Sequence, residues 1–166
     1  MQIKQLVFDL GGVLIDWSPR YFFKKIFEDE TKLDYFLTEV CNMEWHAKQD
    51  AGRSFAEATD DLAGKFPEYE EAIRLFYPSW DEMFSGVFED TLAVFYRLKA
   101  TYPLYALTNW PAEAFPKARK KFDFLSNFQG IVVSGEEKMV KPSPEIYKIL
   151  LQRYSLNANE TVFIDD

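Results

Sequence analysis

Four short apolar segments, each followed at once by polar residues, constrain the fold of this chain more than any other feature. They cover residues 3–8, 104–107, 131–133 and 161–164, and stretches with a helical spacing of apolar residues separate them. Because these segments are mostly apolar rather than alternating, we expect strands that are buried on both faces. Strands that alternate with helices predict an α/β fold, a Rossmann-like parallel sheet with helices on both faces.

A long helical insertion interrupts this alternation between the first two strands. From Tyr21 to Phe84, apolar residues recur at helical spacing in about four segments. The insertion divides the chain into a discontinuous Rossmann-like core and an inserted α-helical cap. We predict that the core consists of residues 1–16 and 88–166, and the cap of residues 17–87.

Two capping patterns help to place helix N-termini. Ser54, followed three residues later by Glu57, is typical of a helix start in the insertion. In the core, Ser143 precedes Pro144, a residue favoured at the first helical position. We expect core helices over 91–98, over 116–122 and from Ser143 to about Tyr154.

Polar side chains lie where each predicted strand ends. In an open parallel sheet, ligands bind outside the carboxyl ends of the strands. These residues are therefore expected to face one site. They are Asp9 after the first strand, Thr108 and Asn109 after the second, Ser134 after the third, and Asp165 and Asp166 after the last.

Asp9 is the most informative of these residues. A carboxylate at the end of a buried strand is costly unless it has a partner or a task. Gly11 and Gly12 follow, and residues without side chains let backbone and ligand approach closely. The segment is consistent with a carboxylate presented to a site, and equally with a solvated Asp in a turn.

The acidic residues at the strand ends predict a metal site. Asp9, Asp165 and Asp166 converge if the first and last strands are neighbours. Mg²⁺ relieves the repulsion among clustered carboxylates, and it also accepts phosphate oxygens of a substrate. We therefore expect Mg²⁺ as the cofactor.

Three residues offer groups that bind an oxyanion. Thr108 and Asn109 supply a hydroxyl and backbone N–H donors. Lys141 lies just before a predicted helix N-terminus, a location that favours anions. Lys138 is the alternative candidate for the cationic role, and a solvated Lys141 is the alternative interpretation.

Composition excludes several classes of function. The 166 residues carry a formal net charge of −8, without the clustered basic face that nucleic-acid binding needs. No stretch approaches the roughly 18 apolar residues of a membrane span. The one cysteine, Cys41, fits a reducing compartment, so we expect a cytoplasmic protein. The one histidine, His46, argues against a His-rich metal site and a Ser-His-Asp triad. The oligomeric state is open.

Four motifs in this order resemble the haloacid dehalogenase superfamily of hydrolases. The resemblance covers the whole chain, and the insertion resembles the α-helical cap of the phosphoglycolate-phosphatase-like, glucose-1-phosphate-phosphatase-like and dehalogenase-like members. Any one motif is weak, but all four in order are specific. The motifs are Phe8-Asp9-Leu10-Gly11-Gly12-Val13, Leu107-Thr108-Asn109, Lys141-Pro142-Ser143-Pro144-Glu145-Ile146-Tyr147 and Val162-Phe163-Ile164-Asp165-Asp166.

The resemblance implies a role for each site residue. Asp9 would be the nucleophile and form an aspartyl-phosphate. Thr108, Asn109 and Lys141 would bind the phosphoryl oxygens. Mg²⁺ would be held by Asp9, the main-chain carbonyl of Gly11, and the pair Asp165 and Asp166.

Two departures from the family pattern affect these expectations. Many phosphatases of the family carry a second Asp, the general acid–base, where this chain has Gly11. A cap residue, His46 or Glu44, is our candidate replacement, because His46 has an ordinary pKa near neutrality. The family also continues beyond the fourth motif, so the chain is expected to be truncated and to bind Mg²⁺ weakly.

The leading interpretation is a Mg²⁺-dependent phosphatase of a small phosphorylated metabolite. A metal-independent 2-haloacid dehalogenase is a second interpretation, although paired Asp165 and Asp166 would repel its carboxylate substrate. A catalytically impaired binding domain is a third. Trp17, Trp45 and Trp110 are expected to pack in the core rather than line the site, and Trp45 and His46 to have packing or surface roles.

Overall fold

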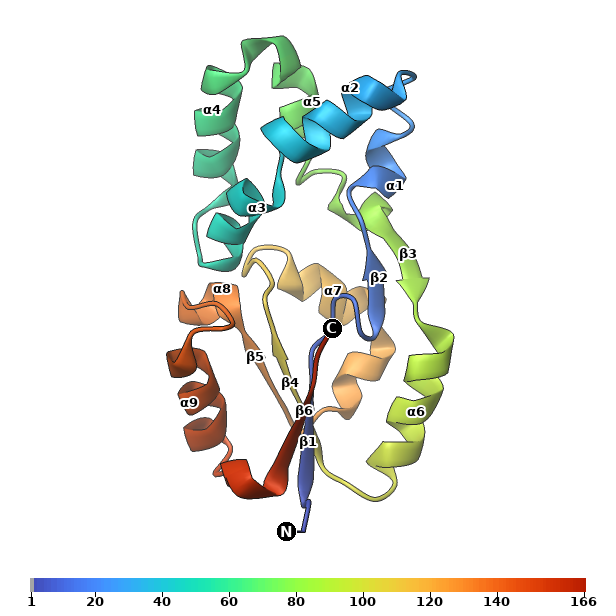
Figure 1. Cartoon of the computed structure of the whole chain (residues 1–166), viewed down its shortest axis with the longest axis vertical. Helices are drawn as coiled ribbons and strands as arrows, with labels where there is room; N and C mark the ends of the chain where they lie inside the picture. The colour runs from blue at the N-terminus through green and yellow to red at the C-terminus, as the bar shows by residue number, and fades with distance from the viewer. Residues whose placement is uncertain (1) are drawn as a thin grey trace.

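The four predicted strands form one parallel sheet in the computed structural model, which describes residues 2–166 (Figure 1). The order β5-β4-β1-β6 makes the first and last strands neighbours, and Phe8 on β1 pairs with Ala106 on β4 and Ile164 on β6. This register brings the carboxyl ends of the strands to one edge of the sheet. The strands are β1 (Gln5–Phe8), β4 (Leu104–Thr108), β5 (Gly130–Val133) and β6 (Thr161–Ile164).

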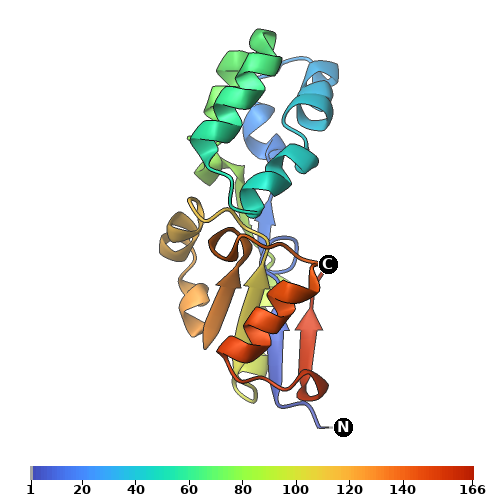
Figure 2. The ribbon, with the colours of Figure 1, turned by 90° about the vertical axis from the view of Figure 1, so that its left-hand side faces the viewer.

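Helices cover both faces of this sheet, as predicted (Figures 1 and 2). α6 (Glu89–Lys99) and α7 (Phe115–Lys121) lie on one face, where Phe95 packs against Phe8 with ring centroids 5.7 Å apart. α9 (Pro144–Arg153) lies on the other face, where Ile146 and Leu150 share an apolar cluster with Val7. Successive residues of β1 therefore contribute to two separate apolar layers.

The inserted helices form a second layer above the carboxyl edge of the sheet (Figure 1). Their core is aromatic, with fully buried Phe23, Phe36 and Phe76 at its centre. The elements are α1 (Arg20–Phe23), α2 (Glu30–Tyr35), the π-helix η1 (Phe36–Val40), α3 (Met43–Asp50), α4 (Phe55–Lys65), the 3₁₀ turn η2 (Pro67–Tyr69), α5 (Glu70–Leu75) and the 3₁₀ turn η3 (Trp80–Met83).

A two-stranded antiparallel ribbon joins these helices to the sheet. It consists of β2 (Ile15–Trp17) and β3 (Phe84–Val87). The domain boundary expected after residue 16 falls within β2, and the boundary expected after residue 87 falls at the end of β3. The chain therefore crosses between the two parts on paired strands.

The helix termini follow the sequence patterns in part. The hydroxyl of Ser54 accepts a hydrogen bond from the Glu57 N–H at 3.2 Å, as the capping pattern predicts. α9 begins at Pro144 as expected, but the Ser143 hydroxyl donates to the Glu145 side chain instead of capping the helix. Two 3₁₀ turns complete the core, η4 (Asp123–Asn127) and η5 (Ala158–Glu160). Across residues 2–166, no helix has both the length and the apolar character that crossing a membrane requires.

Candidate functional site

Asp9 is buried at the carboxyl end of β1. Its N–H donates to the Ile164 carbonyl at 2.9 Å, which continues the pairing with β6. Its Oδ1 accepts from the Leu10 N–H at 2.7 Å, and its Oδ2 lies 2.9 Å from Lys141 Nζ. Burial raises the pKa of Asp9 to about 6, although the Lys141 ammonium acts to lower it. The carboxylate is thus fixed at both oxygens beside a cation.

Lys141 bridges two of the predicted carboxylates. Its Nζ lies 2.9 Å from Asp9 and 3.0 Å from Asp165 Oδ1. The alternative candidate, Lys138, is exposed at the C-terminal end of the short helix α8 (Ser134–Glu137). The structure therefore brings Lys141, and not Lys138, to Asp9.

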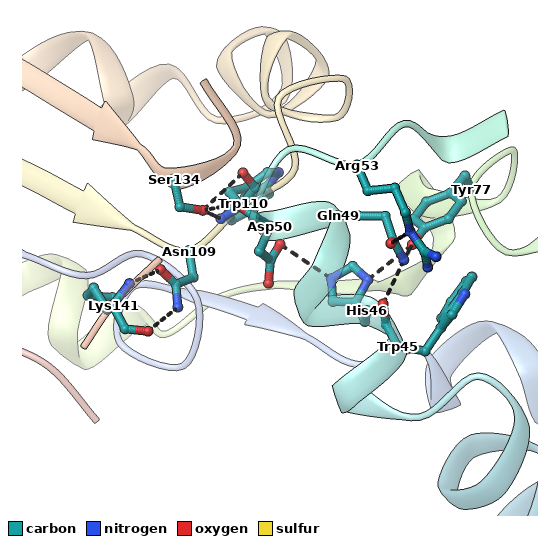
Figure 3. Close-up of polar contacts among 10 residues, drawn as sticks. All are labelled: Trp45, His46, Gln49, Asp50, Arg53, Tyr77, Asn109, Trp110, Ser134 and Lys141. Atoms are coloured by element: carbon teal, nitrogen blue, oxygen red, sulfur yellow. Dashed lines mark hydrogen bonds and ion pairs between the residues drawn. The ribbon is translucent and has the colours of Figure 1, made fainter. Parts of the chain in front are cut away.

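Asn109 holds the Lys141 main chain in place (Figure 3). Its Oδ1 accepts from the Lys141 N–H at 2.8 Å, and its Nδ2 donates to the Lys141 carbonyl at 3.2 Å. Both halves of the amide are therefore occupied with Lys141. These contacts give the Asn109 side chain a positioning task, while its expected part in binding substrate stays a prediction.

The three acidic residues come together as expected. Asp9, Asp165 and Asp166 each offer a carboxylate oxygen, and these oxygens lie within 4.8 Å of one another. Gly12 makes room for this arrangement, because a Cβ at its position would lie 2.5 Å from Asp166 Oδ2. Its φ of +78° also suits glycine. A cluster of hard oxygen donors at a sterically open turn fits Mg²⁺.

Thr108 carries a buried hydroxyl without a partner. The residue is 1% exposed at the end of β4, and its Oγ1 makes no hydrogen bond within residues 2–166. Buried polar atoms of this kind are rare and call for an explanation. A ligand oxyanion bound at the strand ends would supply the missing acceptor.

A cavity of about 350 Å³ lies between the sheet edge and the cap. Gly11 and Asn109 line it from the sheet, and His46 and Asp50 line it from α3. Aromatic rings complete the wall: Trp17, Trp80 and Trp110. Buried Trp110 belongs to the apolar core and half-buried Trp17 packs against it, as expected, and both also line the cavity. Trp45 packs inside the cap, where its indole N–H donates to the Ala58 carbonyl at 3.3 Å.

His46 is buried in an aromatic stack within this wall. Its ring packs against Trp17 and Trp80, with centroid distances of 5.2 and 5.3 Å, and the two indoles lie 4.9 Å from each other. Burial lowers the pKa of His46 to about 4, which removes the near-neutral titration that suggested it as a general acid–base. Glu44, the other candidate, is exposed and lies off the helix face that lines the cavity.

Sequence reasoning missed Asp50. It is a buried carboxylate on the last turn of α3, and burial together with the Asp9 charge raises its pKa to about 7. The signal in the sequence was weak. His46, Gln49 and Asp50 recur at helical spacing within an apolar block, which places three polar side chains on a face that a cap helix would bury.

Several known proteins similar in sequence to this chain are phosphatases. It is 25% identical to a D-ribitol-5-phosphate phosphatase from Bacteroides thetaiotaomicron, covering 99% of this chain and 83% of that protein. It is also 25% identical to a phosphoglycolate phosphatase from Photobacterium profundum, covering 99% and 75%. A sesquiterpene phosphatase from Aspergillus oryzae is 25% identical over 98% of this chain and 80% of its own length.

Solved structures share the fold. A haloacid dehalogenase family enzyme from Bacteroides thetaiotaomicron, in complex with magnesium and inorganic phosphate, aligns with a TM-score of 0.70 and 26% identity over 99% of this chain and 85% of that one. A dehalogenase with an intermediate complex aligns with a TM-score of 0.68 at 18% identity, covering 99% and 76%, and shows the fold alone. The family model for haloacid dehalogenase-like hydrolases matches residues 3–166. With strand order, cap and motifs in agreement, this chain belongs to the haloacid dehalogenase-like hydrolases.

Proposed function

We propose that the protein is a Mg²⁺-dependent phosphatase that hydrolyses a small phosphorylated metabolite through an aspartyl-phosphate. The observation that carries this proposal is the geometry around Asp9. Its buried carboxylate lies 2.9 Å from the Lys141 ammonium and within 4.8 Å of oxygens from Asp165 and Asp166. A fixed nucleophile, a cation and a set of oxygen ligands are the parts that phosphoryl transfer requires.

Each side chain has a task in this reaction. Asp9 attacks phosphorus, and the Lys141 ammonium neutralises charge that develops on the phosphoryl oxygens. The unpartnered Thr108 hydroxyl donates to one of these oxygens, and Asn109 keeps Lys141 in position through its two main-chain hydrogen bonds. Pre-aligned groups of this kind lower the barrier without reorganising during the reaction.

Four residues would hold the metal: Asp9, Asp165 and Asp166 through their carboxylates, and Gly11 through its main-chain carbonyl. Bound Mg²⁺ would supply positive charge to the phosphoryl group and relieve repulsion among the carboxylates. Relatives with magnesium complexes support this assignment. The same proposal divides the chain into domains at residues 16 and 87. It also has the cap close over the cavity.

The cavity supports a small leaving group. Its volume of about 350 Å³ is near the lower limit of ordinary ligand pockets. Curated relatives act on ribitol phosphate, phosphoglycolate and a sesquiterpene phosphate. A small organic phosphate monoester is the substrate class that these observations share.

A panel of phosphate monoesters, assayed with Mg²⁺ and with chelator, tests this function. We expect release of inorganic phosphate that depends on Mg²⁺ and is lost in Asp9→Asn, together with a fluoroberyllate adduct on the wild-type protein. Halide release from a 2-haloacid in the absence of Mg²⁺ would instead identify a dehalogenase. Absence of both activities, with no adduct, would identify a binding domain.

A further inference from the structure

Hydrolysis of an alkyl phosphate needs a proton-transfer group that the site described so far lacks. An alkoxide is a strongly basic leaving group, and the water that later attacks an aspartyl-phosphate must lose a proton. Asp9 serves as nucleophile, Lys141 is a cation, and Asp165 and Asp166 are assigned to the metal. The position two residues after Asp9 is Gly11, which has no side chain to offer.

The cavity wall offers two candidates for this proton-transfer group. Of the residues that line it, only His46 and Asp50 titrate. Both belong to α3, where the cavity face repeats at Met43, His46, Ala47 and Asp50, the spacing of one side of a helix. The choice therefore lies between an imidazole and a carboxyl group.

Both ring nitrogens of His46 already face protein groups (Figure 3). The Tyr77 hydroxyl lies 3.3 Å from Nδ1, and Asp50 Oδ1 lies 3.7 Å from Nε2. Gln49 Nε2 donates to the Tyr77 oxygen at 2.6 Å, so the Tyr77 proton is free to point to Nδ1. This contact places the imidazole proton on Nε2, directed at Asp50.

Asp50 is fixed in the cavity wall by its own main chain. Its carbonyl accepts a 2.7 Å hydrogen bond from the buried Ser134 hydroxyl, which anchors the end of α3 to the sheet edge. Its Oδ1 is buried and makes no hydrogen bond within residues 2–166. This oxygen faces His46, and Asp50 itself lines the largely aromatic cavity, so its carboxyl group is available for proton transfer.

We propose that Asp50, oriented by His46, is the general acid and then the general base of the phosphatase reaction, in place of a side chain at position 11. This inference rests on the proposed function. Asp50 touches the reacting atoms, whereas His46 acts through Asp50 and is a positioning residue. In the free protein a contact of 3.7 Å is long, as catalytic contacts often are before substrate binds.

The two steps balance as follows. Asp9 attacks phosphorus, the bond from phosphorus to the leaving oxygen breaks, and that oxygen takes the proton of the neutral Asp50 carboxyl group. The resulting Asp50 carboxylate removes a proton from water, whose oxygen attacks the phosphorus of the aspartyl-phosphate. The bond to Asp9 then breaks, which returns the Asp9 carboxylate, inorganic phosphate and a neutral Asp50.

The electrostatic surroundings of Asp50 suit a group that acts first as an acid and then as a base. Burial and the Asp9 charge raise the pKa of Asp50 to about 7, so both protonation states are accessible near neutral pH. The titratable and charged groups near Asp50 are His46 on its own helix, Tyr77 after α5, Asp9 after β1, and exposed Lys138, which lies beside Gly52. Of these, Asp9 acts to keep the proton on Asp50.

Two phosphate esters with different leaving groups distinguish a loss of proton donation from a loss of folding. With benzyl phosphate, whose leaving group needs a proton, we expect kcat/KM of Asp50→Asn to fall by about 10²–10⁴-fold. With 4-nitrophenyl phosphate, whose leaving group does not, kcat/KM is expected to stay within about threefold, while kcat falls and a burst of nitrophenolate marks accumulated aspartyl-phosphate. Glu44→Gln, on the same helix but off the cavity face, is the matched control and should behave as wild type with both esters.

Other results overturn the proposal. Equal losses with both esters, or no loss with either, would remove Asp50 from proton transfer. If Asp50→Asn does not fold, the wild-type pH profile decides: kcat/KM for benzyl phosphate must decline above about pH 7, where Asp50 loses its proton, and the nitrophenyl ester must lack this limb. A wild-type protein that cleaves neither ester, or an Asp9→Asn variant that cleaves both, would refute the proposed function itself.

Discussion

The hydroxyl of Ser134, directly after β5, donates a hydrogen bond of 2.7 Å to the main-chain carbonyl of Asp50, at the end of α3. The same hydroxyl oxygen accepts from the Trp110 N–H at 2.9 Å. One fully buried side chain therefore connects two strand ends of the sheet with the cap. Because the anchored carbonyl belongs to Asp50 itself, the contact also controls where the Asp50 carboxyl group lies.

Replacing Ser134 with Ala leaves the Asp50 carbonyl and the Trp110 N–H without this partner. We expect the free energy of unfolding to fall by about 1–3 kcal/mol in chemical denaturation, and kcat/KM with an alkyl phosphate to fall as Asp50 moves. Ser126→Ala is the control, since its hydroxyl donates to the Asp123 carbonyl at 2.7 Å on the exposed surface. Equal losses of stability and of kcat/KM in the two variants would show that the Ser134 contact does not position Asp50.

One matched pair of substitutions distinguishes the roles of Lys141 and Lys138. Lys141→Met removes the cation that lies 2.9 Å from Asp9 and 3.0 Å from Asp165. We expect kcat/KM with 4-nitrophenyl phosphate to fall by about 10²–10³-fold, the usual effect of losing a group that stabilises transition-state charge. Lys138→Met should retain wild-type activity. The reverse ranking would contradict the assignment.

Gly12 tests the metal site through steric crowding. A Cβ there would lie 2.5 Å from Asp166 Oδ2, and the positive φ adds backbone strain. We expect Gly12→Ala to weaken Mg²⁺ binding by about tenfold or more in isothermal titration calorimetry, in the range seen when groups around a metal site are disturbed. Gly64→Ala in α4 is the control, because nothing lies within 4 Å of its added Cβ. Unchanged Mg²⁺ affinity in Gly12→Ala would argue against Asp166 as a ligand.

Gly11 offers a way to return the missing carboxyl group. A Cβ at Gly11 meets no atom within 4 Å, so a larger side chain has space there. In an Asp50→Asn background, Gly11→Asp should recover at least about tenfold in kcat/KM with benzyl phosphate, because a second carboxyl group again reaches the cavity. Gly11→Asn, of the same size but without an ionisable proton, should recover nothing. Equal recovery in both would point to packing rather than proton transfer.

Residues that form the sheet and its carboxyl edge were predictable because their signal is local. Apolar runs that end at Phe8, Leu107, Val133 and Ile164 need no partner to be recognised, and β4 extends only one residue further, to Thr108. Shared direction in a parallel sheet then brings Asp9 and Asp165 together. The direction of the strands alone therefore predicts that the carboxylates share one edge of the sheet.

The ribbon and the cap wall were not predictable, because their signal is non-local. β2 has three residues, and its partner β3 lies about seventy positions later in the chain, so neither segment stands out alone. His46 illustrates the same limit. Its stack with Trp17 and Trp80 depends on residues from three elements, and only that packing lowers its pKa.

His46 and Asp50 respond to burial in opposite directions. Burial lowers the pKa of His46 from 6.5 to about 4 and raises that of Asp50 from 3.8 to about 7. Between about pH 4 and 6.5 both groups are neutral in the folded protein and both are charged in the unfolded chain. His46 contributes stability that is present above its unfolded pKa of 6.5 and lost as pH falls toward 4. Asp50 contributes stability that is present below its unfolded pKa of 3.8 and lost as pH rises toward 7.

The two contributions therefore oppose each other in this window, and removing one exposes the other. Relative to wild type, the free energy of unfolding of Asp50→Asn should rise with pH between about pH 4 and 6.5, because only the His46 response remains; the difference across the window is on the order of 3 kcal/mol. His46→Gln should show the opposite slope. Urea denaturation of both variants across this range, without metal, measures the slopes. Parallel profiles for the two variants would show that burial does not shift the pKa values of His46 and Asp50 in opposite directions.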